Sequence, residues 1–420
     1  MRLFLILAPI VLGVATAVDP ALGTPDGSLG VYRAHPAATE AHAVLLHWAW
    51  ILFVPGFLAL LGPIRRRGVV LARVAWVATV FGLVTFSALM AFDMFLLALE
   101  QTLPDNGTVA RVNETFESLG GWATFGWQVP GLVGWALALV LVPIAAARAR
   151  IISWWVAGAA LAGAAGYFLF AITPLPWCVA GPLVMTVAYA LAARSLGRHV
   201  PDPDEPDTFG AFRFSVGRVC LILAPVAFAA GLATVPGFTP DPAQFTEHPV
   251  QSQASAFLLH LGWLLFIPAV LTIMQTGGRF ARVAGLVTVL ALANFSGLMV
   301  GDYTDLAARM VLTPEQATQV SDAMGGYALF AVSWVLFGMF GTLLGLIVTA
   351  SATTADGRSR WWVPVLVGAG ILAFLALGVG PLSLLSPLLL LAGFGLLTRS
   401  LRYPAPALHA TPAAPAPATP

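Results

Sequence analysis

The sequence predicts an all-α membrane protein of about 12 transmembrane helices, arranged as two parallel six-helix repeats. Three observations predict this class: the composition, a series of long apolar runs, and a repetition of that series along the chain. Of the 420 residues, 59% are hydrophobic and only 9% are charged, whereas soluble domains carry roughly a quarter charged residues. The lipid bilayer is therefore the first expected partner. No basic stretch suggests nucleic-acid binding.

The apolar runs define the expected spans. A helix needs about 20 apolar residues to cross a bilayer core. Runs of about this length fall at 3–18, 42–62, 71–98, 119–146, 151–172, 175–194, 219–236, 254–275, 281–301, 324–350, 362–380 and 382–398.

The first run has the features of a cleavable secretory signal. However, residues 2–9 (RLFLILAP) recur as RVCLILAP at 218–225, deep inside the chain, where no signal peptide is cut. We therefore expect residues 3–18 to be retained as the first helix.

The repetition extends over nearly the whole chain. LLHWAWILFVP (45–55) matches LLHLGWLLFIP (258–268), and FSALMAFD (86–93) matches FSGLMVGD (295–302). Because each unit has an even number of crossings, the two copies should share one orientation in the membrane. The predicted organisation is a first repeat at 1–199, a cytoplasmic linker at 200–217, a second repeat at 218–403 and a disordered cytoplasmic tail at 404–420.

Arginine placement predicts the orientation, because loops on the cytoplasmic side are enriched in basic residues. All 20 basic residues are arginine, and only Arg33, Arg111 and Arg309 fall in predicted outer segments, which leaves 17 on the inner side. Arginine without lysine is typical of GC-rich bacterial genomes. We expect a bacterial cytoplasmic membrane protein with both termini in the cytoplasm.

Ionisable residues inside membrane helices are functional candidates by default. His47 lies in the second expected span and Asp93 near the outer end of the third, and His260 and Asp302 repeat this arrangement. A histidine beside a carboxylate suits a proton relay, an oriented metal ligand or a pH switch. The same pairs also suit a hydrogen-bonded clamp between helices, and this alternative stays open.

Other polar and helix-breaking residues are further candidates. Gln128, Asn294 and Ser296 are expected to line a cavity or to bond neighbouring helices. Pro55 and Pro268 follow the two histidines at matched positions, where they kink a helix for packing or provide a hinge.

The sequence predicts no metal site and no cofactor, since two histidines do not complete a coordination shell and no close-spaced ligand motif occurs. Five of the seven histidines, which are His35, His42, His47, His248 and His260, fall toward the outer side. Haem or copper ligation therefore stays open as an alternative.

The HxxW, ARV and FSxLM segments, which recur at a period of about 200 residues, resemble uncharacterised six-helix integral membrane families of bacteria, here duplicated. This resemblance implies a fold and a location but no activity. The six-plus-six plan also resembles major facilitator type transporters in architecture, although that family's loop motif is missing from residues 62–68.

Three classes of function are compatible with these features. We favour transport or binding of a small amphipathic molecule, which predicts a cavity between the halves that opens to one side. A non-catalytic membrane partner or sensor subunit predicts no such cavity. An intramembrane enzyme acting on a lipid or isoprenoid predicts a lateral cleft that ends on a His/Asp pair, with these residues as acid and base.

Overall fold

A computed structural model describes residues 1–24, 29–200, 205–238 and 242–403. Within these ranges the chain is predominantly helical and contains no strand, as expected from its composition. The predicted tail at 404–420 and the first part of the predicted linker, 201–204, lie outside the described residues.

The first half of the chain, residues 1–200, contains α1 (Phe4–Ala17), α2 (Val31–Ala34), α3 (Pro36–Leu61), α4 (Val69–Val77), η1 (Ala78–Leu83), α5 (Val84–Ala88), α6 (Ala91–Thr102), α7 (Asn106–Ser118), η2 (Trp122–Gln128), α8 (Val129–Arg148), α9 (Trp154–Phe170) and α10 (Trp177–Arg198). The second half, residues 205–403, contains α11 (Thr208–Ala233), η3 (Pro236–Phe238), α12 (Pro242–Glu247), α13 (Pro249–Thr276), α14 (Arg279–Gly297), α15 (Val300–Val311), α16 (Pro314–Gly326), η4 (Phe330–Leu336), α17 (Phe337–Ala355), α18 (Trp362–Leu377), η5 (Pro381–Leu384) and α19 (Leu385–Ser400). The segments η1, η2 and η4 are π-helical, and η3 and η5 are 3-10 turns.

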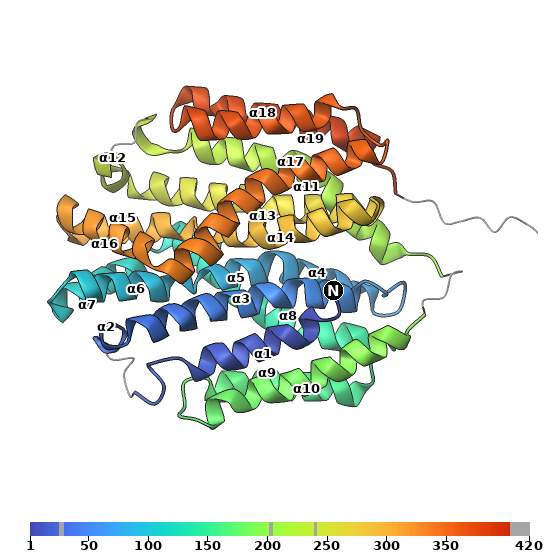
Figure 1. Ribbon diagram of the computed structural model, residues 1–420, viewed down its shortest axis with the longest axis horizontal. Coiled ribbons are helices and arrows are strands. Elements are labelled where there is room, and N and C mark those ends of the chain that lie inside the picture. Colours follow the sequence, from blue (N-terminus) through green and yellow to red (C-terminus); the bar gives the residue numbers. More distant parts are fainter. Residues whose placement is uncertain (25–28, 201–204, 239–241, 404–420) are drawn as a thin grey trace, which may run out of the picture.

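The long helices run nearly side by side, with the first half of the chain below and the second half above in the view of Figure 1. The pair α9 and α10 lies at one edge of this array, and α18 and α19 lie at the opposite edge. The helices α7 and α16 gather at one end of the molecule, and the loop between α3 and α4 lies at the other.

Nine helical stretches in the described part of the chain are long and apolar enough to cross a membrane. They are Pro36–Leu61, Val69–Thr102, Trp122–Arg148, Trp177–Arg198, Thr208–Ala233, Pro249–Thr276, Arg279–Val311, Phe330–Ala355 and Pro381–Ser400. Three further apolar helices are shorter: Phe4–Ala17, Trp154–Phe170 and Trp362–Leu377. The chain is thus an all-helical protein with the features of a multi-pass membrane protein.

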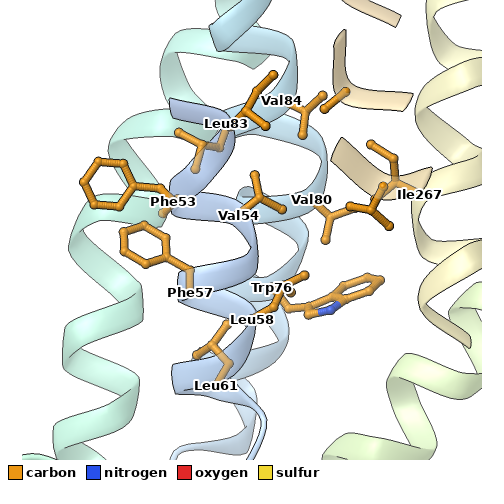
Figure 2. Packing of buried hydrophobic residues seen from close by; sticks show 14 of the residues in the cluster. Phe53, Val54, Phe57, Leu58, Leu61, Trp76, Val80, Leu83, Val84 and Ile267 are labelled. Carbon is orange, nitrogen blue, oxygen red and sulfur yellow. The ribbon is translucent and has the colours of Figure 1, made fainter. Parts of the chain in front are cut away.

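The interior is filled by large apolar side chains. Figure 2 shows Val54 and Leu58 of α3 beside the side chains of η1 and α4, while Ile267 of α13 approaches from the second half. Burying such side chains against each other gives dense packing, in which dispersion contacts and not hydrophobic exclusion from water hold membrane helices together. One core cluster therefore spans both halves.

Small residues set the closest helix crossings. A Cβ atom added to Gly82 of η1 would lie 2.2 Å from the Cα atom of Gly134 in α8. Only glycine at both positions allows these backbones to approach so closely. At a second crossing, Gly56 of α3 faces the backbone of α1 at Leu5.

Short amphipathic helices of both halves meet at one end of the molecule. Helix α7 packs on α15, and α16 packs on α6, around a separate apolar cluster. Hydropathy alone does not predict α7 or α16, because both are polar on average. Their starts carry capping signals: the Asp105 side chain accepts from Gly107 N and Thr108 N, and Thr313 and Gln316 form a capping box.

At the other end, α11 begins 11 residues earlier than the expected helix at 219–236. The segment from Thr208 belongs to the predicted linker at 200–217, but it is helical because Asp207 caps it and Phe209 and Phe214 bury their rings. Asp207 also forms an ion pair with Arg65.

Candidate functional site

His47 lies in α3 with its side chain buried between the two halves. Its Nδ1 atom lies 3.0 Å from the carbonyl oxygen of Ser87, and its Nε2 atom lies 3.1 Å from Oδ1 of Asn294. Its ring stacks on Trp334, with the ring centroids 3.3 Å apart. Because Asn294 and Trp334 belong to α14 and η4, a histidine of the first half is held by the second half.

His260 of α13 has the reciprocal surroundings. Its Nδ1 atom lies 3.0 Å from the carbonyl oxygen of Ser296, and its Nε2 atom lies 3.0 Å from the Thr85 hydroxyl of α5. Its ring stacks on Trp127 of η2 at 3.8 Å between centroids. A histidine of the second half is thus held by the first.

The two tryptophans complete each arrangement. The Trp127 indole donates to the Thr85 carbonyl at 3.1 Å, and the Trp334 indole donates to the Asn294 carbonyl at 3.0 Å. Each indole therefore fixes the residue whose side chain meets the histidine. Both tryptophans lie in π-helical segments, where the wider turn changes the direction of the side chains relative to the rest of the helix.

The two rings differ in the hydrogen-bond donors that face them. A carbonyl oxygen only accepts, so Nδ1 carries the proton in both histidines, and a neutral ring then has a lone pair on Nε2. The Thr85 hydroxyl donates to that lone pair in His260. In His47 the Nε2 atom faces Oδ1 of Asn294, whose Nδ2 donates to the Leu290 carbonyl at 2.8 Å. The neutral His47 ring is therefore one donor short.

This geometry leaves little room for acid–base or metal chemistry at the histidines. All four ring nitrogens face protein atoms, and both side chains are at most 2% exposed. Among the described residues, no group of three or more His, Cys, Asp or Glu side chains is placed to hold a metal ion. The arrangement can join the two halves, and it can respond to a shift between them.

The two carboxylates of the predicted pairs lie elsewhere. Asp93 of α6 points its Oδ2 atom to Nε2 of His42, 3.9 Å away. Asp302 is exposed on α15 and lines a cavity of about 310 Å³ with Asp305 and Arg309. Within the described ranges, no hydrogen bond or ion pair joins His47 to Asp93 or His260 to Asp302.

The remaining candidates fall beside the histidine contacts or at helix crossings. Ser296 accepts from His260 through its backbone, while Gln128 is half-buried at the end of η2. Pro268 is buried within α13, and its carbonyl oxygen faces Gly217 of α11, where an added Cβ atom would lie 2.4 Å from it. Pro55 is buried in α3 next to the Gly56 crossing. Both prolines therefore lie at packed contacts.

Trp127, Trp334, Thr85 and Ser87 were not among the residues singled out from the sequence. For two of them the sequence contains an indication, because Thr85 and Ser87 flank the phenylalanine of the repeated FSxLM segment. The tryptophans carry no comparable signal, since aromatic residues are frequent throughout membrane helices.

Two cavities lie between the halves. The larger, of about 540 Å³, is lined by the end of α3, by Trp76 and by parts of α11, α13 and α14. Its polar atoms come from Arg213, Gln275, Arg282 and Thr272. The second, of about 410 Å³, lies among α4 to α5, α8 and α13, and its lining includes Thr85 and His260.

No protein-family model, no curated protein and no solved structure matches this chain.

Proposed function

We propose that this protein is a twelve-span membrane protein of two parallel six-helix repeats, with both termini cytoplasmic, which binds and transports a small amphipathic molecule. The reciprocal contacts of His47 and His260 support the repeat, because residues at matched sequence positions meet matched partners. The three shorter apolar helices complete the count of twelve, and a tilted or locally thinned bilayer accommodates them.

The cavity of about 540 Å³ is the observation that carries the proposal. Its walls are apolar, with Leu58 and Trp76 from the first half and Leu271 and Leu286 from the second. A cavity between two halves is the expected place for a transported substrate. The walls suit an acyl chain or another hydrocarbon.

The polar lining indicates the head group that this cavity accepts. Arg213, Thr272 and Arg282 line it. A carboxylate or another anionic head would accept from the Arg213 guanidinium, and Arg282 adds a second positive charge at the same cavity.

Quenching of Trp76 fluorescence tests this proposal, because Trp76 lines the cavity. We expect a brominated dodecanoate added to the purified protein to quench the emission, and Trp76→Phe to remove the saturable part of the quenching. Arg213→Gln should weaken binding about tenfold, which corresponds to roughly 1.4 kcal/mol for a charge-assisted hydrogen bond.

Arg218→Gln is the matched control, because Arg218 lies on the same helix but lines a different surface depression. We expect it to bind the carboxylate as the unmodified protein does. A brominated alkylammonium of equal chain length should not bind at this site. Equal binding of both head groups, or quenching that persists in Trp76→Phe, would exclude an anion site in this cavity.

The enzyme alternative has less support. The cavity of about 410 Å³ reaches His260 from a side where Val74, Phe125 and Val133 are exposed, as a lateral lipid-facing cleft should. However, both nitrogens of His260 are engaged by Thr85 and Ser296, so the ring offers no free acid or base.

A further inference from the structure

His42 lies one and a half turns before His47 in α3 and is 7% exposed. Its Nδ1 atom lies 2.8 Å from the carbonyl oxygen of Ala15 in α1. Its Nε2 atom lies 3.9 Å from Oδ2 of Asp19, just after α1, and 3.9 Å from Oδ2 of Asp93 in α6. One imidazole nitrogen is thus placed between two carboxylates.

Hydrogen-bond direction fixes the protonation of this group. The Ala15 carbonyl only accepts, so Nδ1 of His42 must carry a proton. In a neutral ring the Nε2 lone pair would then point at two negatively charged oxygens. A second proton on Nε2 converts this repulsion into two ion-pair contacts. A separation of 3.9 Å suits such contacts directly or through a bridging water.

The surrounding elements leave this imidazolium as the counter-charge of the two carboxylates. Tyr32 of α2 faces Asp93, and burial together with the charges of Asp93, Asp19 and Glu100 raises the pKa of Tyr32, so that its hydroxyl stays protonated. Among the described residues, Tyr167 of α9 and Cys178 of α10 are the other titratable groups near Asp19. None of these groups supplies a positive charge.

Helix α2 covers this site on one side. The Glu100 carboxylate accepts from the backbone nitrogens of Gly30 and Arg33 at 2.9 and 2.8 Å, and the Arg33 guanidinium donates to the carbonyls of Glu100 and Leu103. These bonds bind α2 to α6. Tyr32 is thereby held next to Asp93, whose side chain is 24% exposed.

The second half has no residue equivalent to His42. The sequence match that aligns His47 with His260 aligns His42 with Ser255, whose hydroxyl donates to the Gly231 carbonyl at 2.9 Å. The backbone contact to the preceding helix is thus kept, but the titratable ring is not. Packing between these helices therefore does not need a histidine at this position.

We propose that His42, Asp19 and Asp93 form a proton-binding site at the α2 end of the first half, with the proton held on the imidazole between the two carboxylates. The ligand of this site is a proton, and its binding leaves the three side chains with one net negative charge. The site shares no residue with the anion cavity and does not depend on the proposed function.

Nitrogen NMR of the full chain, with ¹⁵N-labelled histidine and reconstituted in lipid nanodiscs, tests this proposal. At pH 8 an ordinary histidine is mostly neutral, because its usual pKa is about 6.5. We expect one histidine to keep the signature of an imidazolium with both nitrogens protonated. His42→Gln should remove this signal, whereas His248→Gln, which changes an exposed histidine, should leave it in place.

The carboxylate variants Asp19→Asn and Asp93→Asn keep the imidazole and its bond to Ala15, and they test the proposal even where His42→Gln fails to fold. Each should convert much of the imidazolium signal at pH 8 to the neutral form. Only neutral histidines in the unmodified protein, or an imidazolium signal unchanged in both variants, would overturn the site.

Discussion

The imidazole ring of His47 lies flat against the indole of Trp334, with 3.3 Å between ring centroids and 11° between ring planes. The two residues come from different halves of the chain, and His260 and Trp127 repeat the contact in the opposite direction at 3.8 Å. Any sliding of one half against the other must break both stacks. The four rings thus bind the two halves in one register.

The indole donors of these stacks contribute measurably to stability. Trp334→Phe keeps a ring against His47 but removes the hydrogen bond to the Asn294 carbonyl. Interhelical hydrogen bonds in membranes contribute about 0.6 kcal/mol on average and up to about 1.7 kcal/mol, so we expect a loss of roughly 1 kcal/mol in the free energy of unfolding. Trp127→Phe should behave alike. Denaturation by SDS in mixed micelles measures the loss, with the exposed Trp154→Phe as an unchanged control.

The missing donor at His47 predicts an unusual result for Asn294→Thr. A threonine hydroxyl can donate to Nε2 of His47, as Thr85 does to His260 at 3.0 Å. We expect Asn294→Thr to keep or raise the free energy of unfolding. Thr85→Val removes the donor at His260 and should lower it by about 0.6–1.7 kcal/mol. The same SDS denaturation compares them, and a clear loss in Asn294→Thr would mean that the asparagine amide satisfies His47.

The crossing of Gly82 and Gly134 predicts a severe effect of one methyl group. Gly82→Ala places a carbon 2.2 Å from Gly134, so the helices η1 and α8 must separate. Overpacking of this kind costs typically about 1–3 kcal/mol. Gly158→Ala, where a Cβ atom meets nothing within 4 Å, is the matched control and should unfold like the unmodified protein. Thermal unfolding in detergent, followed by circular dichroism, distinguishes them.

Cysteine labelling tests the proposed topology. In a background without Cys178 and Cys220, we expect Thr173→Cys and Val379→Cys to react with an impermeant maleimide on intact cells, and Arg66→Cys to react only after lysis. Thr173 and Val379 follow the short helices α9 and α18. Protection of these two cysteines on intact cells would show that α9 and α18 do not cross the membrane.

The sequence predicts the positions of the helices better than the contacts between them. Apolar runs locate the long helices because lipid forces every backbone group into internal hydrogen bonds. The repeated segments also single out His47, His260, Asn294 and Ser296, which the structure brings together in two sites.

The pairing of these residues depends on helix rotation and on contacts between the halves, which no local pattern encodes. Asp93 follows Ser87, whose carbonyl contacts His47, by six residues, yet its carboxylate faces His42. The stacking on Trp127 and Trp334 involves π-helical segments, which no pattern in the sequence predicts.

The two histidines differ in when their partners from the other half are synthesised. Thr85 and Trp127 precede His260 in the chain, whereas Asn294 follows His47 by 247 residues. At a synthesis rate of about 5–20 residues per second, the ribosome needs roughly 10–50 s to cover that distance. Until then the nascent first half holds the His47 ring with Ser87 as a partner but without Asn294 and Trp334. Any product that ends before Asn294 therefore leaves Nε2 of His47 without its partner.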